Sequence, residues 1–252
     1  MNLTSTNNEK VKFWEKLKIK KYRDKEKLFL IEDEHLVNIA LEKNIVKEIL
    51  VLEEKKYNVP TFIVNEKIMK QLTSQVTTPK VVAVCHMLNE QNPEGNIILL
   101  DNIQDPGNLG TIIRSASAFN FNTIILSNNS VDLYNPKVIR ATEGMIFNVN
   151  VIRTDLEKFI IKYKNNFTFI TTDVNDGEDI REMSHKNVAL VIGNEGNGVR
   201  KEIADLCSKK INIKMNKNCE SLNAGVCASI LMYEVNYEWF CFNWKNCKYL
   251  WN

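Results

Sequence analysis

The sequence predicts an α/β protein with a small N-terminal α/β domain followed by a larger domain built on a mainly parallel sheet. Three observations support this fold class. Short apolar runs alternate with helical patterns along the whole chain, which is typical of α/β proteins. In the C-terminal part the apolar runs are uninterrupted, as in strands that helices cover on both faces. The polar stretch 89–95 (NEQNPEG) lies between the two parts and is interpreted as a linker.

The length and composition of the chain favour a soluble globular protein. Its 252 residues suffice for two modest domains with buried cores. Apolar residues make up 44% and charged residues 25%, which argues against the disordered, fibrous and membrane classes. No apolar run approaches the roughly 18 residues of a membrane span, and the polar, lysine-rich N-terminus does not resemble a secretory signal. We therefore expect a cytoplasmic protein without a membrane partner.

Cysteine and histidine provide no sign of a metal centre. The six cysteines are scattered without a CxxC pair, so we expect reduced thiols. None of the three histidines is spaced with another His or Cys as a zinc site requires. The sequence therefore predicts no metal, and it argues against Cys-His or Ser-His catalysis.

Residues 1–26 form a basic N-terminal segment. Residues 9–27 contain nine Lys or Arg and four Asp or Glu, an excess that suits a phosphate backbone. The alternative is a solvated helix that docks through Phe13, Trp14 and Leu17 while its lysines provide solubility. Taken alone, the segment favours this second interpretation, because charge runs are usually solvated faces.

Residues 27–88 are expected to form the small domain. Apolar runs bounded by turn residues predict its strands, and Leu36, Ile39 and Ala40 stand at helical spacing. The size is plausible for independent folding. The expected strands are 27–32, 47–52, 61–64 and 80–86, and the expected helices are 34–43 and 66–73.

Residues 96–236 are expected to form the larger domain. In a parallel sheet, ligands bind beyond the carboxyl ends of the strands. Three segments fall at such ends, namely 101–114, 193–198 and 215–223, so we expect a site built from them. The expected strands are 97–100, 123–126, 167–171 and 188–192, with helices at about 107–119, 155–164, 199–207 and 223–236.

The first segment passes through a Pro-Gly turn into a helix whose apolar stripe does not include Arg114. An arginine in the second turn of a helix that begins at a strand end is well placed to hold a phosphate or a polar substrate group. The alternative is an ordinary surface arginine.

The second segment, LVIGNEGNGV (190–199), leaves a buried strand through Gly193, Gly196 and Gly198. Glycines at a strand end allow the backbone to approach a ligand closely. Their GxxGxG spacing differs from the GxGxxG dinucleotide fingerprint, so a nicotinamide-dependent enzyme is only a rival interpretation. No GxxxxGK(S/T) motif supports an NTPase.

The third segment places Ser221 and Asn223 before a helix that is apolar almost all round. Such a helix must be buried, either inside the domain or against a second subunit. Small residues near its start permit close packing. Taken singly, Ser221 and Asn223 are more typical of helix caps than of a site.

In this order and with these residues, the three segments resemble the SpoU/TrmH family of RNA ribose methyltransferases within the SPOUT superfamily. FLIEDEHLVNIAL (29–41) and TTPKVVAV (77–84) are similar to that family's ribosomal-protein-like substrate domain. NPKVIRATEGMIFNV (135–149) fits its second conserved block. The resemblance covers nearly the whole chain.

The resemblance implies a deep trefoil knot, an exception to the rule that chains are unknotted. It also implies S-adenosylmethionine as methyl donor, RNA as partner, and a homodimer through helix 223–236. The donor residues that it implies are Gly193, Asn194, Glu195, Gly196, Ile213 to Met215, Ser221, Leu222 and Asn223.

The catalytic group implied by the resemblance consists of Asn108, Arg114, Glu195 and Asn223, with Ser221 beside them. In the family, the arginine has been proposed as the base, but a guanidinium is not expected to lose its proton in a protein. Cationic Arg114 is better suited to hold a phosphate and to stabilise charge on the ribose oxygen. Glu195 or water then accepts the proton, and the identity of the base stays open.

Departures from the family pattern leave alternatives open. Lys214 and Lys217 replace a typical Pro and Gly before Glu220, and Asp33 replaces a glycine of the N-terminal signature. An inactive RNA-binding protein of the same fold is therefore one alternative. Because the small domain resembles that of the ribosomal branch of the family, the resemblance implies ribosomal RNA as the substrate rather than transfer RNA. The aromatic tail, 237–252, is expected to cover apolar surface, with stacking on unpaired bases as the alternative.

Overall fold

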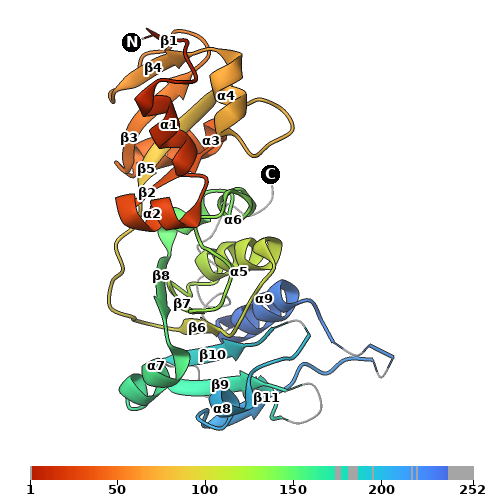
Figure 1. The fold of residues 1–252 in the computed structure, drawn as a ribbon. Helices are drawn as coiled ribbons and strands as arrows, with labels where there is room; N and C mark the ends of the chain where they lie inside the picture. The colour runs from red at the N-terminus through yellow and green to blue at the C-terminus, as the bar shows by residue number, and fades with distance from the viewer. Residues whose placement is uncertain are drawn as a thin grey trace, which may run out of the picture. The chain divides into compact units, whose positions relative to one another are not determined.

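The computed structural model divides the chain into two compact units. Unit 1 comprises Met1–Asn89 and Asp132–Phe147, and unit 2 comprises Glu90–Val131 and Asn148–Asn252. Figure 1 shows the helices and strands of both. The structure describes residues 2–173, 177–180, 187–194, 196–216, 218–219 and 221–237.

Unit 1 contains a mixed five-stranded sheet with the order β1-β4-β3-β5-β2. Strand β5 pairs antiparallel with β2 and β3, whereas β4 pairs parallel with β1 and β3. The four strands expected here are present, and β1 is an addition of two residues, too short for a sequence pattern. The bounds are β1 (Asn2–Leu3), β2 (Leu28–Ile31), β3 (Val46–Val51), β4 (Thr61–Val64) and β5 (Val81–His86).

Four helices of unit 1 come from the N-terminal part of the chain: α1 (Glu9–Lys16), α2 (Lys20–Glu26), α3 (Glu34–Glu42) and α4 (Glu66–Leu72). Trp14 and Leu17 are buried in the core, and Phe13 is partly buried against it. The indole Nε1 of Trp14 donates to Glu48 at 2.8 Å. The docked, solvated helix predicted for the basic segment is confirmed, although the segment forms two helices rather than one.

Unit 1 also contains the segment 132–147, which the sequence analysis assigned to the larger domain. Two ion pairs hold this segment to the N-terminal part. The buried Arg23 guanidinium pairs with Asp132, and Arg140 lies 3.5 Å from the buried carboxylate of Glu32. Residues brought together by such pairs stand about a hundred positions apart, so sequence periodicity does not predict the contact.

Packing reinforces this attachment. The segment includes α6 (Pro136–Ala141) and most of the short 3-10 helix η1 (Met145–Asn148). The rings of Phe29 and Tyr134 lie 4.6 Å apart between centroids. Gly144 has a φ of +83°, and a Cβ there would lie 2.5 Å from Cδ1 of Ile39. The positive φ favours glycine at this position, and any larger residue would also displace the end of the Ile39 side chain.

Unit 2 is built on a six-stranded sheet with the order β11-β9-β10-β6-β7-β8, in which every pair is parallel. The predicted parallel sheet is confirmed. Strand β8 was not expected, because its sequence NVIRT mixes polar and apolar residues at the sheet edge and all five are only half-buried. The bounds are β6 (Ile97–Leu100), β7 (Thr123–Ser127), β8 (Asn150–Thr154), β9 (Thr168–Thr172), β10 (Val188–Ile192) and β11 (Lys209–Ile211).

Helices cover both faces of this sheet, as the uninterrupted apolar strands predicted (Figure 1). Helices α5 (Pro106–Ala118) and α9 (Ala224–Val235) pack together on one face, and α7 (Leu156–Tyr163) and α8 (Lys201–Ala204) lie on the other. Helix α8 is shorter than the 199–207 expected. In the described part of the chain, no helix is both long and apolar enough to span a membrane. The core under α7 and α8 contains Ile97, Leu99, Ile125, Leu156, Phe159, Ile160, Phe169, Ala189, Val191 and Ile203.

Candidate active site

A cavity of about 410 Å³ lies in unit 2, at the carboxyl ends of β9, β10 and β11. Two of the three segments predicted to form the site contribute to it, namely the glycine loop after β10 and the residues before α9. Its described lining residues are Thr172, Asp173, Ile192, Gly193, Asn194, Gly196, Asn197, Gly198, Val199, Ile211, Ile213, Met215, Ser221, Leu222, Ala224 and Cys227.

Most of the predicted donor residues are therefore gathered around one cavity. The exceptions are Lys214, Glu195 and Asn223. Asn223 is not among the described lining residues, although Leu222 and Ala224 on either side of it are. Glu195 lies outside the described residues, as do Lys217 and almost all of the tail 237–252. Lys214 is described, but it forms an ion pair with Asp179 at 3.6 Å and does not line the cavity.

The glycine loop, residues 193–198, is shaped by the side chain of Asn194. Its Oδ1 accepts hydrogen bonds from the backbone of Gly196 at 2.9 Å and of Asn197 at 3.3 Å. A Cβ on Gly193 would lie 2.0 Å from the carbonyl carbon of Gly198, so only glycine fits where the loop folds back on itself.

Asn108 and Asn223 meet between α5 and α9. The amide Nδ2 of Asn223 donates to Oδ1 of Asn108 at 2.7 Å. Asn223 also caps α9, since its Oδ1 accepts from the backbone of Gly225 at 2.9 Å and of Val226 at 3.2 Å. The capping interpretation of Asn223 is thus confirmed, and the same side chain joins the start of α9 to α5, the helix that carries Asn108 and Arg114.

The two helices approach closely because small residues line their contact. A Cβ on Gly225 would lie 3.1 Å from Thr111, and the hydroxyls of Ser115 and Ser229 are 2.6 Å apart. This confirms the close packing predicted from the small residues at the start of the last helix.

Arg114 is exposed on α5, off the buried stripe of that helix, as predicted. Among the described residues it has no hydrogen-bond or ion-pair partner. Its guanidinium is therefore available to a ligand, in contrast to Arg200, which forms an ion pair with buried Asp101. Burial disfavours the charged form of Arg200, but the hydrogen bond and ion pair with Asp101 outweigh this and raise its pKa.

Known proteins share both parts of this architecture. Residues 95–233 match the SpoU rRNA Methylase family, and residues 8–83 match the MRM3-like substrate binding domain. The chain belongs to the SpoU rRNA methylase family.

Full-length relatives of this SpoU family member include the 23S rRNA (guanosine(2553)-2′-O)-methyltransferase RlmP of Bacillus subtilis. The two are 35% identical over 92% of this chain and 98% of the relative. The AdoMet-bound rRNA methyltransferase of Sinorhizobium meliloti is 27% identical, with a TM-score of 0.85 over 94% of this chain and 98% of that one. AviRb of Streptomyces viridochromogenes, 23% identical, shares the fold with a TM-score of 0.83 over 93% of this chain and 99% of that one.

Several lining residues of this SpoU methylase were not predicted. Thr172 is the last residue of β9 and Asp173 directly follows it, so the rule that ligands bind at carboxyl ends would have identified both had it been applied to every strand. Cys227 lies one helical turn after Asn223, where an apolar pattern indicated only core. Burial raises the pKa of its thiol to about 11, which keeps it neutral at physiological pH.

Helix α9 of the SpoU methylase has two faces. Ala228, Leu231 and Val235 are among its buried residues, whereas a stripe of large apolar side chains is exposed. Of the two alternatives predicted for this helix, burial wholly inside the domain does not hold, and burial against a second subunit stays a prediction. The exposed stripe consists of Val226, Ile230 and Tyr233 on α9 and of Tyr237 just beyond its end. Within the described ranges, no group of three or more His, Cys, Asp or Glu side chains is arranged to hold a metal ion.

Proposed function

We propose that this chain transfers a methyl group from S-adenosylmethionine to a ribose 2′-hydroxyl of ribosomal RNA. The observation that carries the proposal is the convergence of the expected donor residues on one cavity at the carboxyl ends of the parallel strands. The 35% sequence identity with a 23S rRNA 2′-O-methyltransferase, over nearly the whole length of both chains, supports ribosomal RNA as the substrate class.

The cavity suits the donor in size and chemistry. About 410 Å³ falls within the roughly 300–1,000 Å³ of pockets that enclose small molecules. Apolar surface from Ile213 and Leu222 suits an adenine ring, and residues of the glycine loop line the same cavity, where their backbone groups can bond the edge of the ring. Bound there, the donor supplies a methyl carbon activated for displacement by its sulfonium.

The residues of this chain contribute mainly by holding the ribose oxygen in place. Arg114 binds the neighbouring phosphate and stabilises negative charge on the attacking oxygen. Both tasks need a cation that is not already paired with a residue of the fold. The bond from Asn223 to Asn108 fixes α5 against α9 and so sets the position of Arg114. Glu195 or a water molecule accepts the hydroxyl proton late in the reaction.

We further propose a homodimer, a knotted C-terminal part and a cytoplasmic location. The exposed apolar stripe on α9 supports the dimer, because a continuous apolar helix face usually marks an interaction site. Family membership supports the trefoil knot and the ribosomal-protein-like character of the small domain. The location follows from the proposed RNA substrate.

The test combines donor binding with methyl transfer. We expect calorimetry to detect S-adenosylmethionine binding, and labelled methyl groups to enter 23S rRNA from a strain lacking this gene, in linkages that block alkaline cleavage next to the modified ribose. Labelling of transfer RNA alone would reassign the substrate. Absence of donor binding would favour an inactive RNA-binding protein, and a thermal shift with NAD alone would favour the nicotinamide rival.

A further inference from the structure

Two backbone hydrogen bonds join the two ends of the glycine loop to each other. The backbone N–H of Asn194 donates to the carbonyl of Gly198 at 3.0 Å, and the N–H of Gly198 donates back at 2.8 Å. Together with the two bonds to Oδ1 of Asn194, these make a tight turn whose inner surface lines the cavity. The shape of the turn therefore sets the shape of one wall.

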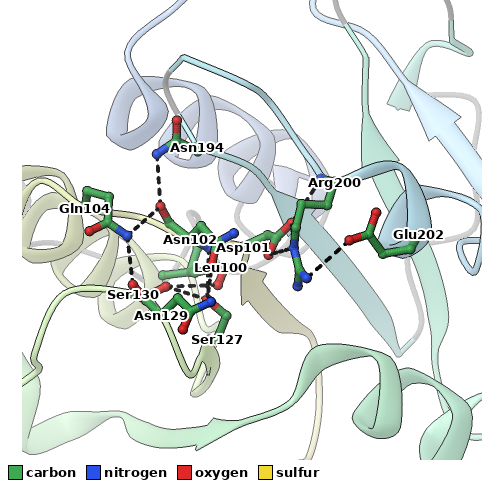
Figure 2. Close-up of polar contacts among 10 residues, drawn as sticks. All are labelled: Leu100, Asp101, Asn102, Gln104, Ser127, Asn129, Ser130, Asn194, Arg200 and Glu202. Atoms are coloured by element: carbon green, nitrogen blue, oxygen red, sulfur yellow. Dashed lines mark hydrogen bonds and ion pairs between the residues drawn. The ribbon is translucent and has the colours of Figure 1, made fainter.

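Two attachments hold this turn to the chain that follows β6, about a hundred residues earlier (Figure 2). At its start, Nδ2 of Asn194 donates to the carbonyl of Asn102 at 3.0 Å. Just beyond its end, Arg200 binds Asp101 through two donors: Nε lies 2.9 Å from Oδ1 and 3.2 Å from Oδ2, and the backbone nitrogen lies 3.0 Å from Oδ2. The turn is thus clamped on both sides by adjacent residues.

The clamp is itself braced. Asn102 has a φ of +57°, a conformation that is uncommon outside glycine, and its N–H donates to Oγ of Ser127 at 2.9 Å. Gln104 donates to the carbonyls of both Asn102 and Asn129, at 3.3 and 2.7 Å. Figure 2 shows these bonds joining the ends of β6 and β7 to the loop after β10. The brace fixes the carbonyl that Asn194 needs.

The burial of Asp101 argues that this arrangement has a purpose beyond stability. Its side chain has no solvent exposure, whereas Arg200 is 36% exposed. A buried ion pair is often no more stabilising than apolar residues of the same volume, because desolvation offsets the attraction. Its directional bonds do, however, specify one geometry for the segment that they hold.

We propose that Asp101 and Arg200 are positioning residues for the methyl donor. They do not line the cavity, but they hold the glycine loop in its donor-binding shape before the donor arrives. The identity of the donor in this inference rests on the proposed function. The effect of the two residues on the conformation of the loop rests on the geometry alone.

The first experiment measures donor affinity and kinetics in the full-length protein. Asp101→Asn and Arg200→Gln should raise the Kd for S-adenosylmethionine roughly tenfold to a hundredfold, the scale of losing a charged hydrogen bond at a preorganised site. The KM for the donor should rise in parallel, while kcat at saturating donor falls much less. Arg200→Lys retains the charge and should recover part of the affinity.

Arg23→Gln is the matched control, because it breaks a second buried arginine–aspartate pair, which lies in unit 1. It should lower the thermal midpoint without changing the donor Kd. Arg200 is partly exposed, so its variants are expected to fold even if Asp101→Asn does not. A folded Arg200→Gln protein that binds the donor with the wild-type Kd overturns the proposal.

The second experiment does not need the donor. Amide hydrogen exchange at residues 194–198 should be roughly tenfold faster in Arg200→Gln than in the wild type, because the turn opens locally more often. Unchanged exchange there would contradict the proposal. A wild-type protein that binds no S-adenosylmethionine but shows the expected exchange difference would defeat the proposed function and leave the clamp intact.

Discussion

The two units use the same chemical device for different ends. Arg23 and Asp132 in unit 1 are 109 positions apart, and Arg200 and Asp101 in unit 2 are 99 apart. In unit 1 the arginine is the more deeply buried member, with 5% exposure, and the pair fastens a segment to a sheet core. In unit 2 the carboxylate is fully buried, and the pair fastens a loop beside a cavity.

The difference shows that an ion pair takes its functional meaning from what it holds. Loss of the first pair should loosen unit 1 and leave the donor cavity as it was. Loss of the second should alter the cavity with a smaller effect on the rest of the fold. Arg114 completes the comparison, because it has no partner among the described residues and is therefore free to meet a substrate.

The largest expected effect comes from removing most of unit 1. Deletion of residues 1–90 should abolish methylation of RNA while donor binding stays nearly intact, because the described lining of the cavity belongs to unit 2. Calorimetry with S-adenosylmethionine and methyl transfer to 23S rRNA measure the two properties. The deletion also strips the partners from residues 132–147, so limited proteolysis should cut there. Retained RNA methylation would contradict the division of labour.

Arg23→Ala tests the pair of unit 1 directly. It leaves Asp132 without its cation, so the free energy of unfolding should fall by about 3–5 kcal/mol, the usual cost of breaking a buried pair. Urea denaturation measures the change. Lys20→Ala in the same helix is the control: its exposed pair with Asp24 should be worth no more than about 1 kcal/mol. Equal effects of the two variants would show that burial does not matter here.

Arg114→Ala should raise the barrier in kcat/KM by roughly 2.7–4 kcal/mol, the scale of losing one well-placed charge-stabilising donor. Arg114→Lys should recover only part, since lysine lacks the planar fork. Donor affinity should change little in both. Loss of donor binding in a folded Arg114→Ala protein would move this residue into the donor pocket, and a normal rate would make it an ordinary surface arginine.

Two glycines of the glycine loop after β10 differ in the space around them and allow a steric comparison. Gly193→Ala should destabilise the protein by about 1–3 kcal/mol, because the new methyl would collide with backbone atoms of Gly198 and Val199. Gly196→Ala meets nothing closer than 3.5 Å, so its thermal midpoint should stay near that of the wild type. Equal midpoints for the two variants would show that the loop rearranges easily.

The smallest effect concerns Cys227. Because burial raises its pKa to about 11, its alkylation by iodoacetamide should be slow at neutral pH and increase about tenfold per pH unit up to that value. The corresponding contribution to stability is complete below about pH 8.5, the ordinary thiol pKa, and is lost as the pH rises through 11. Exposed Cys219 should react first and serves as the control. Because Cys227 lines the cavity, bound donor should slow its alkylation. Protection of Cys219 alone by the donor would place the donor site outside this cavity.

The sequence predicts local structure and the edge at which the site lies. Uninterrupted apolar runs predicted the central strands, because a strand covered on both faces needs apolar residues at every position. Periodicity alone placed Arg114 off the buried stripe of its helix. Strand β8 was missed because an edge strand does not need that composition.

Contacts between distant residues could not be predicted in this way. Nothing near Asp132 or Gly144 in the sequence indicates that Arg23 and Ile39 are their neighbours. The clamp of Asp101 on Arg200 was likewise hidden, since each residue taken singly is compatible with a surface position. Such contacts depend on the packing of whole elements, which local patterns do not encode.

The attachment of residues 132–147 to unit 1 limits how this protein can be recombined. The chain leaves unit 2 after β7, contributes α6 to unit 1 and returns at β8, so the N-terminal domain is not an interchangeable cassette. A chimera that takes residues 1–89 from a relative must also take the matching stretch between β7 and β8, with an acid for Arg23 and a glycine beneath Ile39. Substitutions in residues 1–89 and in residues 132–147 are therefore expected to be correlated among relatives.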